Sequence, residues 1–153
     1  MTKVDERAVV PPVDEPARER LAAALDAPGV VSALLFGSQA RGTSTPLSDV
    51  DIAVWLDPQI PASQRLSWQL RLTGAAAEAL GTGEVQVVIL NDSPPLLAHR
   101  AIRDGVRLVE RDHALRVRLE TRVILDYLDT APLRAILAAG LKRRIEEGRF
   151  GRR

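Results

Sequence analysis

Apolar positions follow two different periods along this chain, and the two periods alternate. Four short runs are aliphatic and β-branched, as buried strands usually are, and they cover residues 30–36, 50–56, 84–90 and 106–110. Longer segments carry apolar residues at helical spacing, and they cover about 15–26, 62–80, 94–105, 112–129 and 132–147. Strands that alternate with helices predict an α/β or α+β fold built around a sheet.

Residues at the ends of the predicted helices support these boundaries. Asp14 can cap the first helix, and Pro16 falls in its first turn, where a missing N–H costs little. Gly81 and Gly83 end the long second helix, because glycine readily takes the left-handed conformation found at helix ends. Ser93 is expected to cap the helix that follows the third strand.

Three parts are expected along the 153 residues. Residues 1–13 end in a proline pair and a valine, which predicts a flexible leader. Residues 14–111 contain all four predicted strands and form the expected folded domain. Residues 112–153 form a C-terminal helical extension that ends in a loose basic tail.

Composition excludes several functional classes. The chain has 21 basic and 20 acidic residues, and this balance argues against a protein that binds nucleic acid directly. It has no cysteine, which excludes a disulfide framework, a thiolate zinc site and a cysteine nucleophile. Neither a membrane-spanning apolar run nor a signal peptide is evident, so we expect a soluble cytoplasmic protein with no membrane partner.

Charge is divided unevenly along the chain. Acidic residues outnumber basic ones through Glu110, and basic residues outnumber acidic ones from Arg111 onward. An acidic body therefore carries a basic C-terminal arm, and such an arm is suited to a protein partner with an acidic surface.

Two carboxylates open the second predicted strand. Asp49 and Asp51 are two residues apart, so both project from one face of the strand while the intervening aliphatic residues project from the other. Neighbouring carboxylates repel each other, and a cation between them relieves the repulsion. Magnesium suits this pair, because it takes oxygen ligands and completes its shell with water and substrate phosphates. Trp55 shares this strand face, where it either flanks a nucleotide base or packs at the edge of the core.

A glycine-serine turn precedes these carboxylates. Gly37 and Ser38 directly follow the first predicted strand and lead into a possible helical turn near 39–41. Glycine permits close approach of the backbone to phosphate, the serine hydroxyl can donate a hydrogen bond, and Arg41 adds a positive charge. A phosphate-binding turn beside two metal-binding carboxylates indicates phosphoryl or nucleotidyl transfer.

The combined motif, GSQARG followed by SDVDIAV, resembles the MNT-type minimal nucleotidyltransferases of the DNA polymerase β superfamily. Ten residues separate Gly-Ser from Asp-x-Asp, and the resemblance covers about residues 30–112, including VQVVILNDSPPLLAHRAIRDGVRLVERD. It implies a nucleotidyltransferase fold with a small mixed sheet of about four strands. It also implies that Asp49 and Asp51 bind Mg²⁺ and act in catalysis. Gly37 and Ser38 would hold the triphosphate of ATP, and Arg41 would support that loop.

One position departs from the family pattern. The family usually has a third carboxylate on the third strand, where this chain has Gln86. An amide oxygen carries no negative charge and cannot accept the proton of the acceptor hydroxyl. Glu84, two residues earlier on the same strand face, or Asp92 could substitute for it. The residues alone leave three possibilities open: a weakened enzyme, an enzyme with a displaced acid, or a protein that has lost catalysis.

The resemblance extends to a partner. MNT proteins with a helical extension typically act as antitoxins to a HEPN ribonuclease toxin, and they transfer AMP from ATP to a toxin tyrosine. Tyr127-Leu128-Asp129 and the sequence around Phe150 look like the C-terminus of that group, which implies a hetero-oligomer with the toxin. A non-catalytic antitoxin that neutralises by binding alone is the alternative. A nucleotidyltransferase for small molecules is a weaker alternative, because the chain lacks a substantial second domain.

Overall fold

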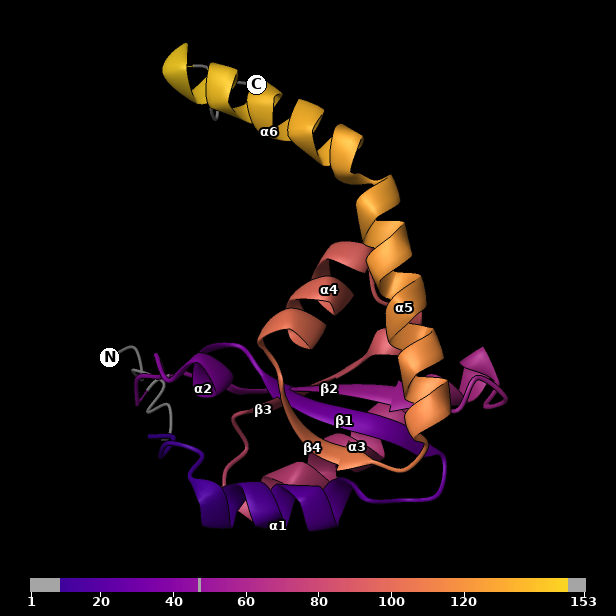
Figure 1. The fold of residues 1–153 in the computed structure, drawn as a ribbon. Helices are drawn as coiled ribbons and strands as arrows, with labels where there is room; N and C mark the ends of the chain where they lie inside the picture. The colour runs from indigo at the N-terminus through magenta and orange to yellow at the C-terminus, as the bar shows by residue number, and fades with distance from the viewer. Residues whose placement is uncertain (1–8, 47, 149–153) are drawn as a thin grey trace.

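The computed structural model describes residues 9–46 and 48–148, and within them a four-stranded sheet carries helices on both faces (Figure 1). The strands are β1 (Val30–Phe36), β2 (Val50–Leu56), β3 (Val85–Ile89) and β4 (Val106–Glu110). The helices are α1 (Glu15–Leu25), α2 (Ser38–Arg41), α3 (Arg65–Leu80), α4 (Pro95–Asp104), α5 (His113–Asp129) and α6 (Ala131–Glu146). Two 3-10 turns accompany them, η1 (Ala62–Gln64) and η2 (Leu90–Asp92).

The sheet is mixed, with strand order β3-β2-β1-β4. β1 pairs antiparallel with both β2 and β4, and β2 pairs parallel with β3. The parallel pair requires a crossover, which η1 and α3 provide. The nucleotidyltransferase-type sheet implied by the sequence resemblance is therefore confirmed.

Alternation along β2 creates two cores. Val50, Ile52, Val54 and Leu56 are buried in the cluster shared with α1 and α3, on one side of the sheet. The other face of β2 meets α4 and α5, which lie on the opposite side of the sheet in Figure 1. Each side chain of the strand therefore projects to the face expected from the period of two.

Helix capping agrees with the sequence at one end and differs at another. Asp14 Oδ1 accepts the Ala17 N–H at 3.0 Å, which confirms the predicted cap of α1. Ser93 is not the cap of α4, because the helix begins at Pro95 and Pro94 takes the capping position. The Ser93 hydroxyl instead donates to the Ile89 carbonyl at 2.9 Å, which closes the 3-10 turn η2.

The expected flexible leader extends less far than 13 residues. Val10 and Val13 are 3% and 6% exposed and belong to the core on the α1 side of the sheet. Residues 1–8 lie outside the described residues. Apolar burial of this kind fixes the segment just before α1 against the body.

Helix α5, the first helix of the expected C-terminal extension, packs on the body. Arg107 of β4 donates to Ser32 Oγ at 2.7 Å and to Glu120 of α5 at 3.2 Å. Arg116 also donates to Glu120, at 2.7 Å, and Val123 is buried against the sheet. A charged network and an apolar contact thus hold α5 over β1 and β4.

Helix α6 differs from the other long helices. It leaves the end of α5 and projects away from the sheet (Figure 1), and none of its described side chains is buried. Among the described residues, no helix combines the length and apolar character needed to cross a bilayer.

Candidate functional site

The predicted site residues meet where β1 ends and β2 and β3 begin. Strand pairing places Asp51 opposite Phe36 of β1 on one side and opposite Gln86 of β3 on the other. Gly37 follows Phe36 directly, so the glycine-serine turn adjoins the Asp51 carboxylate. Gln86 therefore occupies the position that the sequence resemblance assigned to a third carboxylate.

Gly37 lies directly against Asp51. Its φ is +72° and its ψ is −155°, a region that is essentially restricted to glycine. A Cβ atom at this position would lie 2.5 Å from Asp51 Oδ2. The sequence suggested a glycine for approach to phosphate, and the structure adds a second requirement, which is approach to the carboxylate.

The turn continues into α2, a single helical turn that ends at Gly42. The Gly42 N–H donates to the Ser38 carbonyl, and Thr43 N–H donates to the same oxygen at 3.0 Å. Arg41 is exposed at the end of this turn, and its charge acts on Asp51. Gln39, in the same turn, is only 5% exposed, and the sequence alone did not predict this burial.

Electrostatics at the site favour a bound positive charge. Burial raises the pKa of the Asp51 carboxyl, the negative charge of Asp49 raises it further, and Arg41 lowers it. The ionised carboxylates of Asp49 and Asp51 therefore repel each other, and a proton or a cation beside them relieves this repulsion.

Asp49 lines a shallow open depression beside the sheet edge. Its other lining residues are Gly83, Glu84, Val85 and Gln86, and its volume is about 270 Å³. Glu84 thus shares a surface with Asp49, as expected from its strand face. Glu84 and Gln86 therefore line the same depression as Asp49.

Asp92 is not part of this site. It follows the far end of β3, whereas Asp49 and Asp51 stand at the start of the parallel strand β2. Its carboxylate pairs with the guanidinium of Arg65 instead. The possibility that Asp92 replaces the third carboxylate is therefore wrong.

The donor set suits a single hard cation. In the part of the chain that the structure describes, no group of three or more Asp, Glu, His or Cys side chains is arranged to hold a metal ion. Two carboxylates remain, Asp49 and Asp51, with the amide oxygen of Gln86 on the paired strand. Mg²⁺ commonly binds through one or two carboxylates together with substrate phosphates, so these residues fit it.

Trp55 does not adjoin the site. It is 4% exposed and packs in the core between the sheet and helices α4 and α5. It lies near the end of β2, away from the carboxylates at the start of that strand. Of the two interpretations of Trp55, the structure supports packing in the core.

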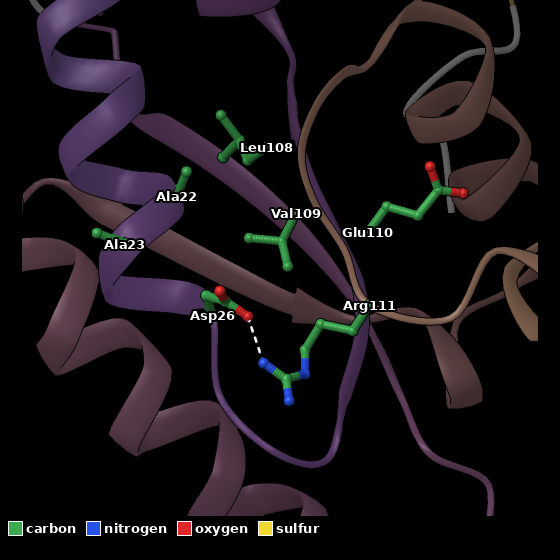
Figure 2. Close-up of a pocket in the computed structure, with 7 residues that line it drawn as sticks. All are labelled: Ala22, Ala23, Asp26, Leu108, Val109, Glu110 and Arg111. Atoms are coloured by element: carbon green, nitrogen blue, oxygen red, sulfur yellow. Dashed lines mark hydrogen bonds and ion pairs between the residues drawn. The ribbon is translucent and has the colours of Figure 1, made fainter.

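A second hollow lies between α1 and the edge strand β4. Figure 2 shows its lining residues, Ala22, Ala23, Asp26, Leu108, Val109, Glu110 and Arg111. Its volume is about 470 Å³, and an ion pair of 2.6 Å between Asp26 and Arg111 spans part of it. It contains none of the predicted site residues, and its two neighbouring opposite charges neutralise each other. The motif residues at the end of β1 and the start of β2 therefore remain the candidate site.

Comparisons with known proteins show the family of the chain. The sequence profile of the family described as "Polymerase beta, Nucleotidyltransferase" matches residues 20–114. No curated protein matches the chain in sequence.

Several solved structures share the fold. A chain of a toxin–antitoxin complex with AMP-PNP is 23% identical with a TM-score of 0.65, over 81% of this chain and 98% of that one. A chain of the MntA–HepT toxin–antitoxin complex is 20% identical with a TM-score of 0.62, over 84% and 99%. A chain of a complex between a tri-AMPylated Shewanella oneidensis HEPN toxin and an MNT antitoxin is 20% identical with a TM-score of 0.60, over 82% and 96%.

Proposed function

Because the chain belongs to the polymerase β nucleotidyltransferase family, we propose that it is an antitoxin that transfers AMP from ATP to a tyrosine hydroxyl of a HEPN ribonuclease toxin. One observation carries this proposal: the register of the sheet brings Asp49 and Asp51 beside the Gly37-Ser38 turn, within the matched region. The AMP-PNP complex and the tri-AMPylated toxin among the similar structures support the nucleotide and the acceptor.

Each residue of the site has a distinct task in this proposal. Asp49 and Asp51 hold Mg²⁺, which when bound supplies positive charge against the phosphate oxygens of ATP. The turn at Gly37 and Ser38 holds the triphosphate with backbone and hydroxyl donors. Arg41, exposed beside the turn, adds a positive charge toward the same phosphates.

The transfer is a displacement at the α-phosphorus of ATP. The tyrosine oxygen forms a bond to this phosphorus, the bond to the bridging oxygen breaks, and pyrophosphate leaves. The hydroxyl proton needs an acceptor, and the amide of Gln86 cannot take it. Glu84 lines the same depression as Asp49, so we assign the general base to Glu84.

Helices α5 and α6 provide the surface for the toxin. Nine large apolar residues on these two helices are exposed: Val117, Ile124, Leu125, Leu128, Leu133, Ile136, Leu137, Leu141 and Ile145. Five of them lie on α6, between Leu133 and Ile145, on a helix that buries none of its described side chains. Large apolar side chains exposed in this number mark an interaction site in soluble proteins.

Charge indicates what kind of partner covers these exposed apolar side chains. The last turns of α6 carry Lys142, Arg143 and Arg144. A second copy of the chain would bring like charges together, whereas a partner with an acidic rim would be attracted. We therefore assign this surface to a protein partner of different sequence, the toxin.

The second candidate function is an antitoxin that acts by binding alone. Gln86 favours it, because the position opposite Asp51 carries no charge and the described residues form no cluster of three carboxylates. In that case α5 and α6 would neutralise the toxin without any covalent change.

Labelled ATP distinguishes the two functions. The protein is incubated with Mg²⁺, ATP labelled at the α-phosphate, and its proposed partner, a HEPN toxin. Transfer of label to the toxin, lost in Asp49→Asn and Asp51→Asn, supports the enzyme. Glu78→Gln on α3 is the matched control, since it removes an exposed carboxylate away from the site. Inhibition of the toxin without label supports the binder and contradicts the enzyme.

A further inference from the structure

The loop that joins β1 to β2 is held from outside by the segment before α1. Gln39 Oε1 accepts the backbone N–H of Val13 at 3.1 Å, and this contact is buried. A second contact lies further along the loop, where Val10 N–H donates to the Pro46 carbonyl at 2.9 Å. Both ends of the loop segment 39–46 are thus attached to residues 10–13.

These attachments have no local substitute. Helix α2 has four residues, and a helix of one turn is not stable without tertiary contacts. The Gln39 Nε2 atom is buried without a hydrogen-bond partner among the described residues, so the amide is held through its oxygen. Exchange of the two amide atoms would set two donors against each other, because Val13 offers an N–H. The Val13 bond therefore helps to fix the loop, together with the Val10–Pro46 bond and the packing of Ala40 on the core.

The segment that provides the bond is itself well anchored. Val10 and Val13 are buried in the same core as Val50, the residue between the two candidate carboxylates. Movement of this segment would therefore disturb the backbone on both sides of the site. Gln39 is the side chain that transmits its position to the turn at Gly37 and Ser38.

We infer that residues 10–13 are a brace that sets the nucleotide affinity of the site, with Gln39 as the positioning residue. This inference rests on the proposed function for the identity of the ligand, a nucleoside triphosphate. The brace acts before binding: it holds the turn beside Asp51, so ATP does not have to order the loop. Loss of the brace should weaken ATP binding and leave the rate at saturating ATP nearly unchanged.

A substitution at Val13 can remove the N–H that donates to Gln39. Asp14 N–H donates to the Pro12 carbonyl at 3.0 Å, which closes a three-residue turn centred on Val13. No non-glycine residue in the described chain has a positive φ, so this is the inverse γ-turn, with φ near −75°. Proline fits that φ and has no N–H, and its Cδ takes the place of the amide hydrogen, so the Gln39 side chain must also move away. Val13→Pro therefore deletes the donor, whereas the matched control Val13→Ala keeps it and loses only side-chain volume.

The experiment measures binding of Mg²⁺·AMP-PNP by calorimetry, and KM and kcat for ATP with the toxin as acceptor. Val13→Pro should raise Kd and KM for the nucleotide about tenfold, as for the loss of one buried hydrogen bond, with kcat within about twofold of wild type. Gln39→Met, which removes the acceptor at similar size, should do the same, and the double variant should be no worse than either single one. Val13→Ala should change Kd by less than about threefold.

A second readout covers a variant that folds poorly. Hydrogen exchange of the amides in 38–42 should accelerate in Gln39→Met while exchange in β2 stays at the wild-type rate. Unchanged nucleotide Kd in folded Val13→Pro and Gln39→Met would overturn the brace and leave the proposed function intact. A wild-type protein that does not bind Mg²⁺·AMP-PNP would overturn the proposed function and, with it, the role of the brace in nucleotide affinity.

Discussion

Substitution of Gly37 by alanine tests whether the turn and the carboxylate are fitted to each other. Two costs follow from the structure. The backbone conformation at φ +72°, ψ −155° costs a residue with a Cβ atom about 1–3 kcal/mol. The new methyl group would also lie 2.5 Å from Asp51 Oδ2, so the carboxylate or the turn must shift. Turning the Asp51 side chain off its preferred rotamer to relieve this contact costs about 0.5–1.5 kcal/mol more.

The expected total is a loss of about 1.5–4.5 kcal/mol in the free energy of unfolding. Urea denaturation followed by circular dichroism measures it directly. Gly42→Ala is the matched control, because Gly42 also has a positive φ of +69°, but a methyl group added there would meet no atom within 4 Å. It should therefore show only the backbone cost, about 1 kcal/mol.

The double variant Gly37→Ala, Asp51→Ala separates the two costs. Without the carboxylate the methyl group meets no oxygen, and only the backbone cost should remain. The reasoning is refuted if Gly37→Ala costs no more than Gly42→Ala, or if removal of the Asp51 side chain brings no relief.

Three further results are expected. Asp51→Asn should raise the melting temperature at pH 7 by about 1–4 °C, because it removes the cost of burying a charge and the like-charge contact with Asp49. The pKa of Asp51 is raised in the folded state, so the wild type gains stability as the pH falls and Asp51 takes up its proton. The higher melting temperature of Asp51→Asn should therefore vanish by about pH 3, below the pKa of Asp51 in the unfolded chain. A difference in melting temperature that persists at pH 3 would contradict the electrostatic cause. Gln86→Asp should increase AMP transfer to the toxin about tenfold or more in a labelled-ATP assay if the site has lost its third carboxylate, and decreased transfer would exclude that interpretation. Leu137→Asp should weaken toxin binding at least tenfold by calorimetry with a melting temperature within about 2 °C of wild type, because its side chain is 63% exposed; Glu78→Gln on α3 is the control outside this surface, and equal losses in both variants would count against an apolar contact.

Local sequence patterns were sufficient for the regular elements. The strands at 30–36 and 50–56 have the predicted bounds, because short β-branched and aliphatic runs flanked by glycine and proline favour a strand over a helix. The Asp14 cap also needed only local information, since the carboxylate bonds an amide three residues away. The Ser93 cap failed because Pro94 and Pro95 follow it, and their fixed φ displaces the helix start.

Contacts between distant residues could not be predicted in this way. The motif brought Gly37 and Asp51 into one site, yet the close approach of the glycine to the carboxylate depends on the pairing of Phe36 with Asp51. The burial of Val10 and Val13 was missed because the segment is too short to show a period and contains prolines. The exclusion of Asp92 required the direction of β3, which sequence spacing does not give.

The free-standing helix α6 has a consequence for turnover. A helix of 16 residues that buries none of its side chains is close to the limit of stability in water, so in the free chain it should open often. Proteases cleave segments that open often, and a bound partner suppresses that opening by mass action. The free chain would then be degraded faster than the complex, and the amount of this protein in the cell would follow the amount of its partner.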